Sequence, residues 1–143
     1  MGALLVSFGS LITPSILSVP VFDINILIYY LNGVFSARGR EQITDWIQQG
    51  AFISVVSRIE VLGFAQPQQE RIRARSFLTL FRESALAAEV VEKTISIRRR
   101  HSIPVPDAII AATALDLDRP LVTRNTTDFE TIDGLPLLNP FED

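Results

Sequence analysis

Short apolar runs alternate along the chain with longer segments in which apolar residues recur every three or four positions. The short runs, which are rich in β-branched residues, predict strands at residues 19–23, 52–56, 121–123 and 137–138. Strands that alternate with helices usually form a parallel sheet with right-handed crossovers. We therefore predict an α/β fold with a central parallel sheet of about four to five short strands flanked by helices.

The longer segments predict helices at residues 25–31, 38–49, 57–65, 68–81, 86–101 and 107–117. In the third of these helices we expect Ser57 to be the N-cap and Ile59, Leu62 and Gly63 to face inward. The two long helices carry arginines on one face, so they are expected to form an outer layer. The last helix is rich in alanine, whose small side chain allows close packing against a sheet.

The start of the chain does not match the domain that follows. Its first twenty residues are uncharged and apolar, but Pro14 interrupts them before they reach the ~20 residues that a bilayer span requires. They also lack the basic segment of a signal peptide. We leave residues 1–18 as an unassigned apolar N-terminal extension and assign the domain to residues 19–143, without a membrane partner.

Composition narrows the possible chemistry. The chain of 143 residues fits one domain, and 48% hydrophobic with 20% charged residues excludes a disordered protein. Without cysteine it has no disulfide or thiolate nucleophile, which is compatible with a cytoplasmic location. One histidine, His101, and one lysine, Lys93, leave little for a catalytic triad, a histidine-rich metal site or a P-loop. Carboxylates remain as the candidate chemical groups.

Four acidic residues lie where the predicted sheet would bind a ligand. They follow strands or begin helices, and each is flanked by apolar residues: Asp23, Glu60, Asp107 and Asp128. Two carboxylates ~5 Å apart repel by roughly 3 kcal/mol at an effective dielectric constant of ~20, so a converging set requires a cation. Oxygen ligands without histidine or cysteine favour Mg²⁺ or Mn²⁺ over zinc.

Each acid also has an ordinary structural role open to it. Asp23 or Asn25 would cap the helix that follows, and Glu60 would complete a capping box with Ser57. Asp107 would complement a helix dipole. Asp128, taken alone, is typical of a surface loop. The functional interpretation therefore depends on the four acids as a set.

The set also supports a resemblance. The segments VFDINILIYYL, ISVVSRIEVLGF, VPDAIIAATAL and LVTRNTTDF, in this order, resemble the characteristic blocks of PIN-domain ribonucleases, specifically VapC-type toxins of toxin–antitoxin systems. The resemblance covers residues 19–139. The apolar extension before Val19 departs from the family, whose members usually begin within a few residues of the first strand. The resemblance implies a single PIN-like nuclease domain.

By the same resemblance, Asp23, Glu60 and Asp107 match the three core metal ligands of the family, and Asn25 matches a supporting polar residue. In some members the fourth acid directly follows a Thr-Arg pair. In this chain the pair is Thr123 and Arg124, and the residue that follows it is Asn125. We choose Asp128 as the fourth ligand and catalytic residue. Thr123 and Asn125 are then supporting polar residues.

The implied function is that of a toxin that hydrolyses RNA with Mg²⁺ or Mn²⁺. A cognate antitoxin and a homodimer are also implied, with Phe77 and Phe81 as candidate contact residues unless both face the core. Arginines of the outer helices are candidates to bind RNA phosphates.

The alternative is a catalytically inactive PIN-type module that binds RNA or metal. A haloacid-dehalogenase-like phosphatase and a receiver domain fit less well, because the lysine that each requires is misplaced or missing.

Overall fold

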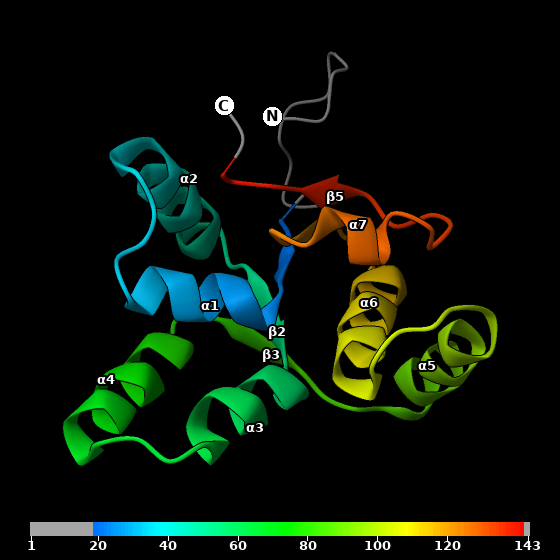
Figure 1. Ribbon diagram of the computed structural model, residues 1–143, viewed down its shortest axis with the longest axis horizontal. Helices are drawn as coiled ribbons and strands as arrows, with labels where there is room; N and C mark the ends of the chain where they lie inside the picture. Colours follow the sequence, from blue (N-terminus) through cyan, green and yellow to red (C-terminus); the bar gives the residue numbers. More distant parts are fainter. Residues whose placement is uncertain (1–18, 142–143) are drawn as a thin grey trace.

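The computed structural model describes residues 19–141, which alternate strands and helices around one sheet (Figure 1). In chain order the elements are β1 (Val21–Phe22), α1 (Ile24–Leu31), α2 (Ala37–Gln48), β2 (Phe52–Ser54), α3 (Val55–Gly63), α4 (Gln68–Leu78), β3 (Arg82–Ser84), α5 (Ala88–Arg100), α6 (Val105–Leu117), β4 (Leu121–Val122), α7 (Thr126–Phe129) and β5 (Leu137–Leu138). The predicted α/β class is confirmed. The extension at residues 1–18 lies outside the described residues.

The five strands form a parallel sheet in the order β3-β2-β1-β4-β5. The central strand β1 pairs through Val21 with Phe52 of β2 on one side and with Leu121 of β4 on the other. Because all strands run the same way, their carboxyl ends share one edge of the sheet, which we call the carboxyl edge. The segments that follow β1, β2 and β4 all begin there.

Apolar side chains cover both faces of the sheet. Phe22 belongs to a cluster with residues of α1, α2 and α4, whereas its neighbour Val21 belongs to a second cluster with residues of α5 and α6. Successive residues of a strand point to opposite faces, so one strand serves both clusters. Phe77 and Phe81 lie in the first cluster and are each only 8% exposed. The proposed dimer contact through these two phenylalanines is therefore wrong.

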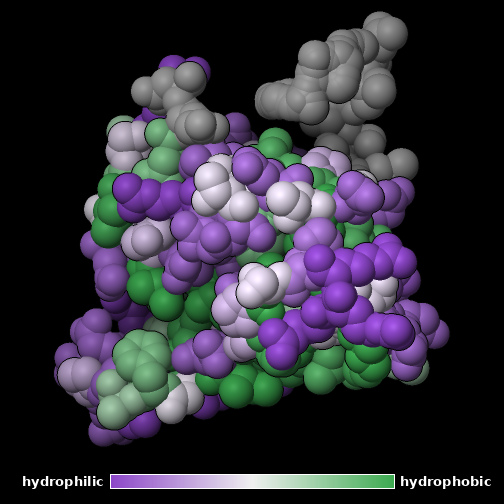
Figure 2. Space-filling model, turned by 45° about the vertical axis from the view of Figure 1, so that its right-hand side comes forward, coloured by the Kyte–Doolittle hydropathy of each residue, from purple (hydrophilic) through white to green (hydrophobic). Residues whose placement is uncertain are grey.

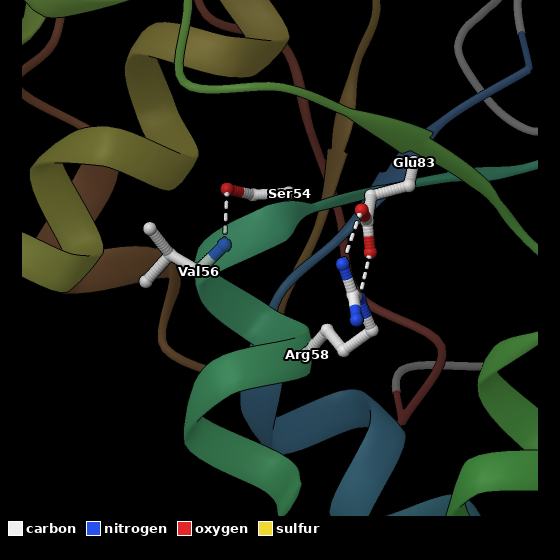
Figure 3. A network of polar contacts seen from close by, with 4 residues as sticks. All are labelled: Ser54, Val56, Arg58 and Glu83. Carbon is white, nitrogen blue, oxygen red and sulfur yellow. Dashed lines mark hydrogen bonds and ion pairs between the residues drawn. The ribbon is translucent and has the colours of Figure 1, made fainter. Parts of the chain in front are cut away.

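Helix α3 begins earlier than predicted. Its N-cap is Ser54, whose Oγ accepts a hydrogen bond from the Val56 backbone N–H at 3.1 Å, as Figure 3 shows. Ser57 lies inside the helix and is buried, and Ile59 is 62% exposed. The predicted cap at Ser57 and the inward orientation of Ile59 are both wrong. The pattern was misinterpreted because two serines lie three positions apart, and the first was assigned to the strand.

In the same helix Gly63 is exposed, which also contradicts its predicted inward orientation, while Leu62 packs against the first apolar cluster. The residues that face the interior most fully are Ser57 and Val61, one helical turn apart. This register leaves Glu60 on the exposed side of α3. The orientation of Glu60 follows from the packing of its neighbours.

The edge strand β3 was not predicted. The helix expected at residues 68–81 ends at Leu78, and a strand without apolar residues follows. Its Glu83 accepts from Arg58 of α3 through both carboxylate oxygens, at 2.5 and 3.1 Å (Figure 3). Its Arg82 stacks over the Phe52 ring at 4.1 Å. Polar and cation–π contacts hold this strand, so hydrophobic periodicity contained no signal for it.

No helix within residues 19–141 is both long enough and apolar enough to cross a membrane.

Candidate active site

Asp23 is the first residue after β1 and the N-cap of α1. Its Oδ1 accepts from the Ile24 backbone N–H at 2.8 Å, and its Oδ2 accepts from Thr123 Oγ1 at 2.8 Å. The residue is only 3% exposed. The capping role that the sequence left open for Asp23 is therefore real, and it occupies one oxygen while the other faces β4.

Thr123 supports Asp23 from the neighbouring strand. It directly follows β4 and is fully buried, and besides donating to Asp23 its Oγ1 accepts from the Asn125 backbone N–H at 3.0 Å. One hydroxyl thus connects the end of β1 to the turn that leads into α7. The carboxylate of Asp23 has little freedom to rotate as a result.

Asp107 reaches the same edge from a helix. It lies in the first turn of α6, and α6 ends just before β4 begins. A helix that leads into a parallel strand runs opposite to it, so α6 begins at the carboxyl edge. The side chain of Asp107 is half-buried. Burial and the charges of Asp128 and Glu60 raise its pKa.

The pKa of Asp23 is raised from 3.8 to about 6. Burial is the largest cause, because it penalises the charged form. The hydrogen bonds from Thr123 and from the Ile24 backbone oppose it, and the negative charges of Asp107 and Asp128 add to it. Asp23 is consequently an acid that neighbouring acids help to keep protonated.

Glu60 and Asp128 are the exposed members of the set. Glu60 lies on α3 and Asp128 on α7, and the charge of each raises the pKa of Asp107. Figure 1 shows α1, α3, α6 and α7 arranged around the carboxyl edge. The four acids named from the sequence therefore lie in one electrostatic neighbourhood.

The two asparagines occupy less enclosed positions. Asn25 is exposed on the first turn of α1, and Asn125 is exposed at the N-cap of α7, where its side chain makes no capping hydrogen bond. Of the three supporting residues expected from the sequence, Thr123 hydrogen-bonds to an acid of the set. The supporting roles of Asn25 and Asn125 stay predictions.

The donor chemistry suits a hard divalent cation, because the four side chains offer only carboxylate oxygens. As the side chains stand, no three acids or histidines of residues 19–141 are close enough together to hold one ion. Asp107 and Asp128 nevertheless raise the pKa of Asp23, and Asp128 and Glu60 raise the pKa of Asp107, in addition to the larger effect of burial on both. A bound ion would relieve this repulsion.

One contact near this edge was not foreseen. His101, which follows α5, lies 3.3 Å from the hydroxyl of Thr131, a residue just after α7 (His101 Nδ1 to Thr131 Oγ1). The contact joins segments thirty residues apart. Sequence reasoning had no signal for it, because neither residue belongs to a recognisable motif and only the tertiary fold brings them together.

Comparisons with known proteins agree with this geometry. A family model described as PIN domain matches residues 21–135. A chain of the toxin-antitoxin complex from Klebsiella pneumoniae is 31% identical with a TM-score of 0.72, covering 87% of this chain and 99% of that one. No curated protein sequence matches.

Two further solved structures are similar in fold. A chain of DNA-bound VapBC from Salmonella typhimurium is 19% identical with a TM-score of 0.75, covering 84% of this chain and 96% of that one. VapBC2 from Rickettsia felis, bound to a promoter DNA fragment, gives 20% identity and a TM-score of 0.72, covering 83% and 96%. Because the family model spans most of the sequence, the chain belongs to the PIN domain family.

Proposed function

We propose that this chain is a metal-dependent endoribonuclease and the toxin of a toxin–antitoxin pair. The observation that carries the proposal is that Asp23, after β1, and Asp107, in the first turn of α6, lie at the same sheet edge, where charges of neighbouring acids raise the pKa of each. Acids collected in this way destabilise the protein unless they bind a cation. Membership of the PIN family and similarity to chains of toxin–antitoxin complexes support it.

The proposed ligands of Mg²⁺ or Mn²⁺ are Asp23, Glu60, Asp107 and Asp128. When bound, such a cation lowers the pKa of a coordinated water and offsets charge on phosphoryl oxygens. Thr123 and the Ile24 N–H keep the Asp23 carboxylate in one orientation, so this ligand is fixed before RNA binds. Glu60 and Asp128 are exposed, so we propose that they are the ligands nearest to an approaching RNA phosphate.

The proton that the attacking water loses needs an acceptor. The carboxylates themselves are the candidates, because the only histidine, His101, contacts Thr131 and the chain contains no cysteine. Asp128, exposed and coupled to both Asp23 and Asp107, is the member of the set best placed to orient a water on the open side. We therefore assign it that role in addition to metal binding.

The test is cleavage of a total RNA pool by the purified protein in Mg²⁺ and in EDTA. Asp107→Asn should abolish cleavage and leave the fold intact, because it removes a ligand and a repelling charge. A matched control is Asp45→Asn, since Asp45 is exposed near the end of α2, at the opposite edge of the sheet where β2 begins. RNA cleavage by Asp107→Asn, or by wild type in EDTA, would overturn the metal mechanism.

The same assay addresses the alternative of an inactive binding module. Such a module would bind RNA or metal without producing cleavage products under any metal condition. Binding without turnover in wild-type protein, measured with Mg²⁺ and with Mn²⁺, would favour this alternative over the nuclease.

The partner proposals follow from the toxin assignment. We expect a cytoplasmic protein that binds a cognate antitoxin and forms a homodimer. With Phe77 and Phe81 buried, the candidates for contact are the exposed apolar residues of α3, α4 and the segment between them: Ile59, Phe64 and Ile72. Light scattering at micromolar concentration should give twice 15.9 kDa. A monomer, together with normal growth of cells that express the chain alone, would contradict both proposals.

A further inference from the structure

The end of α5 carries three consecutive arginines whose roles differ. Arg98 Nη1 donates to the Ile103 carbonyl at 2.7 Å, within the short connection that leads from α5 into α6. The guanidinium of Arg98 therefore stabilises the connection between α5 and α6. Arg99 and Arg100 are exposed, and no ion pair with either is found in residues 19–141.

The position of this arginine pair relative to the acids follows from helix packing. α5 and α6 are joined by residues 101–104 and pack side by side, and Lys93 of α5 pairs with Asp116 of α6 at 3.1 Å. Lys93 is near the middle of α5 and Asp116 near the end of α6, so the two helices run antiparallel. The last turn of α5 accordingly lies beside the first turn of α6, which carries Asp107.

A second contact ties the end of α5 to this edge. His101 contacts Thr131, which follows α7 by two residues, and α7 carries Asp128. The last turn of α5, which carries the arginine pair, therefore lies at the sheet edge where α6 begins with Asp107.

The surface around the pair is hollowed and strongly hydrophilic. Figure 2 brings the α5 side forward and shows the most hydrophilic side chains gathered over this region. A shallow hollow of about 430 Å³ on α5 is lined by Arg99 and Arg100 with Ile95 and Ser96, and by Glu92 at its acidic end. Phosphate oxygens can contact the two guanidinium groups while Glu92 excludes them from the remainder.

From these contacts we infer that Arg99 and Arg100 form the track that holds the RNA phosphate backbone beside the acidic centre. The inference rests on the proposed function, because a nuclease centre made of carboxylates repels its own polyanionic substrate and needs cations near it. Single-stranded RNA is the proposed partner, because the last turn of α5 lies at the same sheet edge as the helix starts that carry Asp107 and Asp128.

The experiment measures binding of a fluorescently labelled single-stranded RNA of mixed sequence to the full chain in EDTA, so that no cleavage interferes. Arg99→Gln/Arg100→Gln should weaken binding roughly tenfold at low salt and reduce the slope of log affinity against log salt by about 1.4, the value for two lost phosphate contacts. The matched control is Arg71→Gln/Arg75→Gln on α4, whose exposed arginines belong to the other face of the sheet.

Both double variants remove two positive charges, so net charge alone would weaken binding equally. Equal losses, or no loss in the α5 variant, would overturn the inference. So would an α5 variant that binds RNA normally but escapes neutralisation by the antitoxin, since the pair would then bind protein. Thermal melting of each variant excludes a folding defect.

A cleavage assay in Mg²⁺ separates this inference from the proposed function. The α5 variant should raise KM roughly tenfold with little change in kcat, because it loses RNA binding and keeps the proposed ligands. Wild-type protein that binds RNA through the pair but never cleaves it would overturn the proposed function alone. An α5 variant that cleaves RNA as efficiently as wild type would overturn the RNA-binding role of the arginine pair and leave the proposed function intact.

Discussion

Asp23 is buried, which raises its pKa, and accepts two hydrogen bonds, which lower it. The effect of burial is the larger, so the pKa is raised. A raised carboxyl pKa means that the folded protein keeps a proton that the unfolded chain releases, so stability declines as pH rises from about 4 to about 6. A shift from 3.8 to about 6 corresponds to about 3 kcal/mol lost by pH 7 in the absence of metal. Without metal, the protein is therefore more stable at low pH, where Asp23 is protonated, than at neutral pH.

The corresponding prediction compares wild type with Asp23→Asn in EDTA. The substitution costs part of the cap and of the Thr123 contact at every pH, but it removes the titrating group. The stability of the variant relative to wild type should therefore improve by up to about 3 kcal/mol between pH 4 and pH 7. Urea unfolding at several pH values measures this difference. Parallel pH profiles for the two proteins would contradict the assigned pKa.

A second prediction concerns the hydrogen bond from Thr123 to Asp23. Thr123→Val keeps the shape of the side chain but removes the donor to Asp23, so the protein should lose roughly 1–3 kcal/mol and most of its RNA cleavage. Thr113→Val is the control, because Thr113 is equally buried but bonds only within α6, to the Ile109 carbonyl at 2.7 Å. If both variants lose activity in proportion to stability, Thr123 has no special link to the site.

Among the elements, α3 offers the sharpest test of local structure. Ser54 caps the helix, whereas the Oγ of Ser57 is buried and has no hydrogen-bond partner within the described residues. Ser54→Ala should cost about 0.5–2 kcal/mol, and Ser57→Ala should be neutral or stabilising. Thermal melting of the two variants decides between the caps. A larger loss at Ser57 would restore the capping box with Glu60 that the sequence suggested.

Hydrophobic periodicity predicted α1 to α6 and four of the five strands of residues 19–141, but it missed the short helix α7. It failed at β3, where Arg82 and Glu83 replace apolar residues and are held by contacts with Phe52 and Arg58. It also failed at the start of α3, where either serine satisfies the capping pattern. In both places the outcome depends on a partner distant in sequence, which no local pattern contains.

At the scale of the whole molecule, the parallel sheet explains why residues far apart in sequence form one site. β1 and β4 are neighbours, so the residues that follow them, Asp23 and Thr123, meet at 2.8 Å. α6 returns Asp107 to the same edge. The positions of the acids could be anticipated from strand ends, but their burial could not: Asp23 is enclosed and Glu60 and Asp128 are open.

The difference in burial has a consequence for the whole site. A cation that binds the carboxylates must displace the proton that the buried Asp23 holds below pH about 6. Metal binding and proton release are therefore coupled through Asp23. This coupling distinguishes a built metal site from acids that are merely close to one another on a surface.

The most direct measurement of the central claim is calorimetric titration of Mn²⁺ into the full chain at pH 6 and pH 8, each in two buffers of different ionisation enthalpy. We expect binding that releases about half a proton at pH 6 and almost none at pH 8, given a pKa of about 6 for Asp23. Asp107→Asn should weaken it at least about tenfold, and Asp45→Asn should leave it unchanged. Equal Mn²⁺ binding by wild type and Asp107→Asn, or none by wild type, would contradict the account.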